Sequence, residues 1–192
     1  MNLKDRDLAR RSVPVVGICD GYQMLGEKLL DPEGVESSQA EALGLGLLPL
    51  TTVFAVTKET HRVEGEVAVA EGLLEGAKGI SFRGYEIHMG RPMGEGLKEP
   101  FEISKRSGEA CNEPDGVLSP SGRVLGTYVH GLNPPLRRAI LERVAEWKGV
   151  KMPSPGTEFD QDWEYDQLAE VVRSSLDMDL IYRLVGLKKT AP

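Results

Sequence analysis

Apolar and polar residues alternate along this chain in patterns that predict both strands and helices. The first apolar run, residues 13–18, is short and continuous, as in a buried strand. Residues 20–30 then carry apolar side chains at helical spacing, and the turn sequence at residues 31–34 ends this predicted helix. A strand followed directly by a helix favours an α/β fold.

The middle of the chain predicts mainly strands, at residues 51–54, around residues 63–69 and at residues 80–89. In the last of these, alternation places Tyr85, Ile87 and Met89 on one face and Glu86 and His88 on the other. Residues 92–116 are polar and contain several Gly and Pro, so we expect a surface excursion there. Residues 117–118 and 123–129, joined by a Ser-Pro-Ser-Gly turn, predict a hairpin.

The last third of the chain predicts helices. Asn133 as N-cap, Pro134 in the first turn and Gly149 as the stop mark the ends of one helix. Residues 150–160 read as a linker to helices between residues 162 and 187, and residues 1–12 as a ragged, charged start. The length of 192 residues fits one domain over residues 1–192. We expect three layers, with a mainly parallel sheet and an antiparallel extension over residues 51–129.

The charge, the lengths of the apolar runs and the cysteine count argue against several classes of function. The net charge is −7 and the longest basic cluster is Lys188-Lys189, which argues against a nucleic-acid surface. No apolar run reaches the length of a membrane span, so we expect no membrane partner. Two cysteines make no disulfide framework, which favours a cytoplasmic protein with reduced thiols. The sequence contains no zinc-binding pattern, and we expect no bound metal.

Cys19 is the leading candidate for chemistry. It lies between glycines, in Gly17-Ile18-Cys19-Asp20-Gly21, where the predicted strand meets the predicted helix. Such a turn exposes a nucleophile, and the helix N-terminus favours the thiolate. The competing interpretation is a small buried hydrophobic residue.

Three further residues could complete a site. His130 ends a predicted strand, where a general base could assist a distant cysteine, or it could be a structural histidine. Gln23 could bind a polar substrate from the first helical turn, or it could be a surface residue. Glu86, with His88, could line a pocket or orient a catalytic group, or it could lie on a solvent-exposed strand face.

Four segments in this order resemble a known family. They are residues 17–26 (GICDGYQMLG), 44–49 (GLGLLP), 84–90 (GYEIHMG) and 126–131 (GTYVHG). Together they resemble the glutamine amidotransferase domain of cobyric acid synthase, within the class I glutamine amidotransferases, whose fold is flavodoxin-like. The resemblance extends from about residue 13 to the end of the chain.

This resemblance implies specific roles. Cys19 would attack the glutamine side-chain amide, and His130 would activate the thiol and then a water. The backbone N–H of Asp20 would stabilise the oxyanion, and Gln23 would bind glutamine. Ammonia would pass to a synthetase domain or chain that uses ATP and Mg²⁺ to amidate corrin carboxylates in cobalamin biosynthesis. This chain has no P-loop, so we expect it to bind no ATP or other cofactor.

The chain also departs from the family pattern. Asp20 stands where the family usually has Gly, directly after the nucleophile. An inward-pointing carboxylate would oppose the thiolate, and we expect this one to point to solvent. Leu132 stands where many class I amidotransferases carry a Glu, two residues after the His. The cobyric acid group resembles this departure, so a Cys-His pair could suffice, and Glu86 is a candidate partner carboxylate. Only 18 residues precede Cys19, so we expect the first strands to be missing and the isolated chain to have little glutaminase activity.

Two alternatives remain open at this point. One is an amidotransferase that serves another ATP-dependent ligase, such as one that amidates a cell-wall precursor. The other is a non-catalytic remnant that binds a partner.

Overall fold

The computed structural model of this protein describes residues 13–152 and 161–186. These residues form two compact units, one over residues 13–152 and the other over residues 161–186. The expected ragged start, most of the expected linker and residue 187 lie outside the described residues.

A small sheet carries the start of the chain. β1 (Val15–Ile18) pairs in parallel with β9 (Val124–Thr127), and β9 pairs with β8 (Val117–Leu118) in the predicted hairpin. Neighbouring residues of β9 contribute to different cores, because Val124 packs with Tyr22 of helix α2 (Asp20–Leu25) and Leu125 packs with Phe82. Strand β9 is therefore buried on both faces. Strand β1 differs from the expected buried strand, because Val16 and Ile18 are 43% and 41% exposed.

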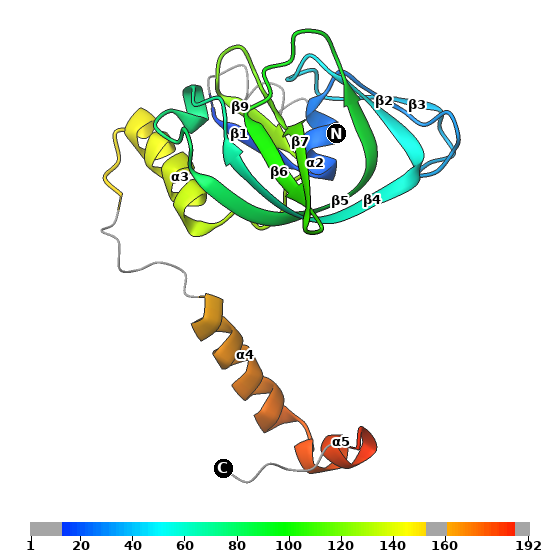
Figure 1. Ribbon diagram of the computed structural model, residues 1–192, viewed down its shortest axis with the longest axis vertical. Helices are drawn as coiled ribbons and strands as arrows, with labels where there is room; N and C mark the ends of the chain where they lie inside the picture. The colour runs from blue at the N-terminus through cyan, green and yellow to red at the C-terminus, as the bar shows by residue number, and fades with distance from the viewer. Residues whose placement is uncertain (1–12, 153–160, 187–192) are drawn as a thin grey trace. The chain divides into compact units, whose positions relative to one another are not determined.

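A larger sheet forms the rest of the first unit. Its strand order is β3 (Glu41–Leu43), β2 (Lys28–Leu30), β4 (Thr51–Val67), β6 (Phe101–Arg106) and β7 (Glu109–Asp115), and β5 (Ser81–Met93) also pairs with β4. Figure 1 shows the long strands β4 and β5 curving across the unit. Strand β2 runs parallel to β4, whereas the other pairs of this sheet are antiparallel. The α/β class is confirmed, and the antiparallel part of the described residues is larger than the sequence predicts.

Two segments differ from the sequence prediction. The helix expected over residues 20–30 ends at Leu25, and Lys28–Leu30 instead forms β2 beside β4. The surface excursion expected over residues 92–116 contains the β6–β7 hairpin. Phe101 and Ile103 anchor that hairpin because both side chains lie in the main hydrophobic core.

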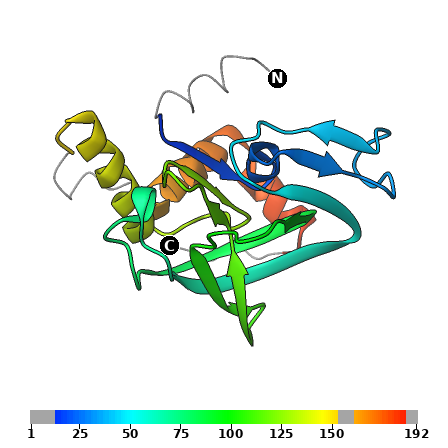
Figure 2. The ribbon, with the colours of Figure 1, turned by 90° about the horizontal axis from the view of Figure 1, so that it is seen from above.

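Helix α3 (Pro134–Lys148) covers one end of the first unit, opposite β2 and β3 (Figure 2). Asn133 is its N-cap residue, as predicted, although its side-chain amide donates to the carbonyl of Ser81 instead of capping the helix. Gly149 ends the helix in the left-handed conformation, also as predicted. Leu136 and Ile140 pack into the core between α3 and the larger sheet.

The second unit contains α4 (Gln161–Ser175) and α5 (Met178–Leu184), close to the helices that the sequence predicts. Asp177 caps α5 by accepting a hydrogen bond from the backbone N–H of Leu180. Across residues 13–152 and 161–186, no helix combines the length and apolar character needed to cross a membrane.

Candidate active site

Cys19 occupies a sharp turn between β1 and α2. Its backbone angles are φ 55° and ψ −116°, which a residue with a side chain rarely adopts. A β-carbon at Gly17 would lie 2.6 Å from Leu25 Cδ1 and 2.8 Å from the backbone of Gly21, so Gly17 lets helix and strand approach closely. A β-carbon at Gly21 would meet no atom within 4 Å, so the close approach does not require glycine at that position. The structure therefore has the strand–turn–helix geometry of a nucleophile elbow.

The environment of Cys19 favours the protonated thiol over the thiolate. Its Sγ donates to the carbonyl of Ile87 at 3.3 Å and lies 3.7 Å from Oδ1 of Asp20. Burial and then the Asp20 carboxylate raise the pKa of Cys19. Asp20 is exposed, as expected, but its carboxylate still lies near the sulfur. The thiol thus needs a base before it can act as a nucleophile.

The sheet brings His130 to the same edge as Cys19. In the parallel pair, Ile18 of β1 lies opposite Thr127 of β9, and the N–H of Cys19 donates to the Thr127 carbonyl at 3.0 Å. Cys19 and His130 therefore follow the carboxyl ends of neighbouring parallel strands, where α/β sheets usually carry their chemistry. Both ends meet β5, which contacts Cys19 at Ile87 and His130 at Tyr85. No hydrogen bond joins the Cys19 thiol and the His130 ring, both of which lie in the described part of the chain.

Gln23 lies inside the molecule. Its side chain is only 4% exposed, so the alternative of a surface residue is wrong. A β-carbon at Gly90 would lie 2.6 Å from Gln23 Nε2 and 2.7 Å from Tyr128 Oη, which shows how closely these groups surround β5. The amide lies beside the Tyr128 hydroxyl, although the geometry falls short of a full hydrogen bond.

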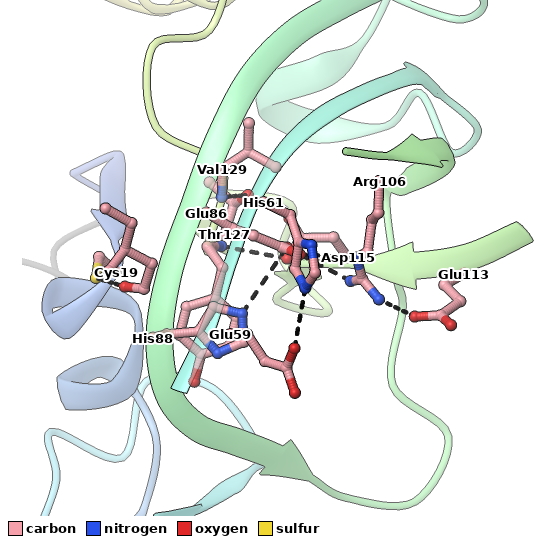
Figure 3. Close-up of polar contacts among 12 residues, drawn as sticks. Cys19, Glu59, His61, Glu86, His88, Arg106, Glu113, Asp115, Thr127 and Val129 are labelled. Atoms are coloured by element: carbon pink, nitrogen blue, oxygen red, sulfur yellow. Dashed lines mark hydrogen bonds and ion pairs between the residues drawn. The ribbon is translucent and has the colours of Figure 1, made fainter. Parts of the chain in front are cut away.

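Glu86 belongs to a buried polar network on the inner face of β5. Its carboxylate is 1% exposed and lies 2.7 Å from Nε of Arg106 and 3.8 Å from Nε2 of His88. Burial alone would raise the pKa of Glu86, but the contact with His88 and the charge of Arg106 together lower it. Arg106 also pairs with Glu113, and Cys19 stands apart from this cluster (Figure 3).

These positions separate Glu86 from His130. The ring of His130 stacks on Tyr85, and adjacent residues of a strand point to opposite faces of the sheet. The alternative of a solvent-exposed face for Glu86 is wrong. The structure instead places this carboxylate with Arg106 and His88.

The segment Gly126–Gly131 holds the two sheets together. The ring of Tyr128 stacks on His88 at 3.7 Å between centroids, and the hydroxyl of Thr127 donates to the buried carboxylate of Asp115. The backbone N–H of Tyr128 donates to the same carboxylate at 3.2 Å. Burial raises the pKa of Asp115 to about 6, despite these two hydrogen bonds.

Two of the cavities border strand β5, and Glu86 lines both. A small inner cavity of about 110 Å³ is lined by Glu86, His88, Arg106, Asp115 and the rings of Tyr22 and Tyr128. An outer cleft of about 620 Å³ is lined by Thr60, Arg62, Tyr85, Ile87 and Lys105, among others. The outer cleft shares Tyr85 and Ile87 with the contacts of His130 and Cys19, so it adjoins the proposed reacting groups. Among the residues that the structure describes, no group of three or more His, Cys, Asp and Glu side chains could hold a metal ion.

Sequence reasoning missed several residues that build this site. Tyr85 and Ile87 were predicted to share a face, but their contacts with His130 and Cys19 depend on how the strands pair. Arg106 and Asp115 lie in the segment expected to be a surface excursion. The alternation of Phe101 and Ile103 with polar residues was the available signal for a strand there.

Curated relatives match nearly the whole chain. A cobyric acid synthase of Dehalococcoides mccartyi is 41% identical over 180 residues, which cover 93% of this chain and 36% of the relative. The cobyric acid synthases of Desulforamulus reducens and Clostridium kluyveri are 38% and 40% identical, over 97% and 91% of this chain and 37% and 34% of those proteins. The chain thus spans about a third of the length of these relatives.

Among solved structures, PurLQS from Thermotoga maritima matches 74% of this chain and 65% of that chain, with 18% identity and a TM-score of 0.49. The family described as the CobB/CobQ-like glutamine amidotransferase domain matches residues 3–135. That match includes the Cys19 elbow, β5 with Tyr85, Glu86 and Ile87, and the segment that ends at His130. Since it covers more than half of the 192 residues, this chain belongs to the CobB/CobQ-like glutamine amidotransferase domain family.

Proposed function

We propose that this chain is the glutamine-hydrolysing part of a cobyric acid synthase. The observation that carries the proposal is the Cys19 elbow, placed by the β1–β9 pair at the same sheet edge as His130. The three cobyric acid synthase relatives at about 40% identity support this choice over a ligase that amidates another acceptor.

The reaction would start with proton transfer. Because the pKa of the Cys19 thiol is raised, His130 would take its proton, and the thiolate would then attack the side-chain amide carbon of glutamine. The backbone N–H of Asp20, at the start of α2, would donate to the oxyanion. His130 would then protonate the departing nitrogen, so that ammonia leaves and a glutamyl thioester remains on Cys19.

The second half of the reaction would use the same groups. His130 would remove a proton from water, the resulting hydroxide would attack the thioester, and glutamate would leave as the Cys19 thiol is restored. The ammonia would serve a synthetase domain or chain that binds ATP, Mg²⁺ and a corrin substrate and amidates corrin carboxylates in cobalamin biosynthesis. The chain would perform this work in the cytoplasm.

The outer cleft suits the amino-acid end of glutamine. Arg62 lies opposite Tyr85 in the β4–β5 pair, and Thr60 lies opposite Ile87, so these side chains share the outer face. In the described part of the chain, no carboxylate is within ion-pair distance of the Arg62 guanidinium. Arg62 would bind the α-carboxylate, because a guanidinium recognises a carboxylate with paired hydrogen bonds. Gln23 would help to bind the glutamine from its position beside Gly90 and the Tyr128 hydroxyl.

Labelling with the glutamine analogue 6-diazo-5-oxo-norleucine tests this function. Mass spectrometry should find the label on Cys19 and not on Cys111, and added glutamine should protect Cys19. The Cys19→Ala variant is the matched control and should remain unlabelled. Labelling that is absent, or equal at both cysteines, would contradict the proposed function and favour a partner-binding role without catalysis.

A further inference from the structure

Tyr85 and His130 contact each other through both their backbones and their rings. The N–H of Tyr85 donates to the His130 carbonyl at 3.1 Å, and the N–H of His130 donates to the Tyr85 carbonyl at 2.7 Å. Their rings are stacked, with centroids 4.8 Å apart and an interplanar angle of 4°. The backbone pair fixes where the His130 side chain starts, and the stack fixes the plane of its ring.

Gly84 makes this close pairing possible. A β-carbon at Gly84 would lie 2.3 Å from the His130 carbonyl oxygen and 2.6 Å from Cγ1 of Val129. Any side chain there would push β5 away from the segment that carries His130. The sequence Gly84-Tyr85 therefore brings β5 against His130 and then supplies the ring that packs on it.

The buried carboxylates of the first unit that could serve as partners have other contacts. Glu86 is engaged by Arg106 and His88, and Asp115 is engaged by Thr127 and the backbone of Tyr128. Leu132, two residues after His130, is packed in the hydrophobic core. Within residues 13–152 and 161–186, no carboxylate accepts a hydrogen bond from the His130 ring. The orientation that a carboxylate gives the histidine of a catalytic triad must come from elsewhere in this site.

We propose that Tyr85 is the positioning residue for His130, and that its ring holds the imidazole plane toward Cys19 by stacking. This inference rests on the proposed function, in which His130 is the general base. The contacts of β5 fit this role, because Ile87, two residues after Tyr85, accepts the hydrogen bond from the Cys19 thiol. One strand thus sets the positions of both the nucleophile and its base.

Replacement of Tyr85 should reveal the role without unfolding the protein, because the side chain is 47% exposed. In Tyr85→Leu, kcat for glutamine hydrolysis should fall about tenfold, which is the scale of one aromatic stack, with KM within about twofold. Tyr85→Phe keeps the aromatic ring and should have the same kcat as the wild type. Tyr165→Leu removes an exposed tyrosine of α4 and is the matched control, with kcat expected to be unchanged.

A second readout follows the His130 ring directly. The chain contains three histidines, so NMR can resolve their ring protons. The His130 signals should lie upfield in the wild type and in Tyr85→Phe, and should move downfield in Tyr85→Leu as the stack is lost. The signals of His61 and His88 should stay in place.

The outcomes separate this inference from the proposed function. A wild-type kcat in Tyr85→Leu, or an equal loss in Tyr85→Phe, would overturn the positioning role of the ring. If the isolated chain hydrolyses too little glutamine to measure, NMR decides the inference, and the labelling of Cys19 decides the proposed function. Unchanged His130 shifts in Tyr85→Leu would then overturn the inference, and a selective downfield move would support it.

Discussion

The guanidinium of Arg106 lies 2.7 Å from the carboxylate of Glu86, and that carboxylate is almost completely buried. A buried charge that loses its partner is costly, because the interior cannot replace water. Arg106→Met should therefore lower the free energy of unfolding by about 3 kcal/mol, and adding Glu86→Gln should recover part of this loss. Urea unfolding, followed by Trp147 fluorescence in a Trp163→Phe background, measures both variants.

Arg83→Met is the control for this first prediction. The Arg83 guanidinium is 82% exposed and lies 3.7 Å from Glu64, so its loss should change the free energy of unfolding by less than about 0.5 kcal/mol. Equal effects of Arg106→Met and Arg83→Met would show that burial adds nothing to the Glu86–Arg106 pair.

The buried carboxyl of Asp115 should make stability depend on pH. Its pKa of about 6 is above the unfolded value, so between these two values the folded state holds a proton that the unfolded state has lost. The resulting stability is present at low pH and is lost as pH rises through about 6. From pH 4.5 to pH 7 this contribution should fall by about 2 kcal/mol.

Asp115→Asn isolates this effect because the amide does not titrate. The free energy of unfolding of the wild type relative to Asp115→Asn should decrease between pH 4.5 and pH 7, as measured by urea unfolding. Glu86 acts in the opposite direction, because its pKa is lowered and its contribution is lost only at more acidic pH. A pH-independent difference between wild type and Asp115→Asn would contradict the raised pKa.

Arg62 should affect glutamine binding and not the chemical step. Arg62→Gln should raise KM for glutamine about tenfold with kcat unchanged, because the lost ion pair stabilises substrate and transition state equally. Arg83→Gln removes a charge from an exposed arginine of the neighbouring strand β5 and should leave KM unchanged. An unchanged KM in Arg62→Gln would remove Arg62 from the glutamine site and leave the roles of Cys19 and His130 untouched.

The sequence alone identified the elements with strong local signals. The strand before Cys19, the 80–89 strand and the helix between Asn133 and Gly149 are marked by periodicity, caps and turns, and the structure contains all three. The β6–β7 hairpin escaped prediction because Gly and Pro around it resemble a loop. Pro114 is tolerated within β7 because that strand lies at the edge of the sheet.

The sequence predicted only part of the candidate site, because local patterns do not show which distant segments pair. Cys19 and His130 follow strands, and that local signal places both at a sheet edge. The contacts Tyr85–His130 and Ile87–Cys19 arise from strand pairing between distant segments, which no local pattern encodes. The Glu86–Arg106 pair likewise requires β5 and β6 to flank β4.

The strained backbone at Cys19 should cost stability. Glycine adopts a positive φ without penalty, so Cys19→Gly should be about 1 kcal/mol more stable to unfolding than Cys19→Ala. Both variants lack the thiol, so the comparison isolates the backbone from the loss of side-chain contacts. Thermal or urea unfolding measures the difference. Equal stability would show that the turn at Cys19 stores no strain.

Asp20 should suppress the reactivity of the neighbouring thiol. Burial is the largest cause of the raised pKa of Cys19, and the Asp20 carboxylate is the next. Asp20→Asn removes that negative charge while keeping the size of the side chain, so the pKa of Cys19 should fall. At pH 7.5 more thiolate would be present, and iodoacetamide should alkylate Cys19 faster than in the wild type. The pH dependence of this rate, followed by mass spectrometry of the Cys19 peptide, gives the pKa of the Cys19 thiol directly.

The control for this prediction is Glu170→Gln, which removes the same charge from α4 and should leave the pH profile of Cys19 alkylation unchanged. A profile in Asp20→Asn that matches the wild type would show that burial alone sets the pKa of the nucleophile, and that the carboxylate 3.7 Å from the sulfur is screened by solvent.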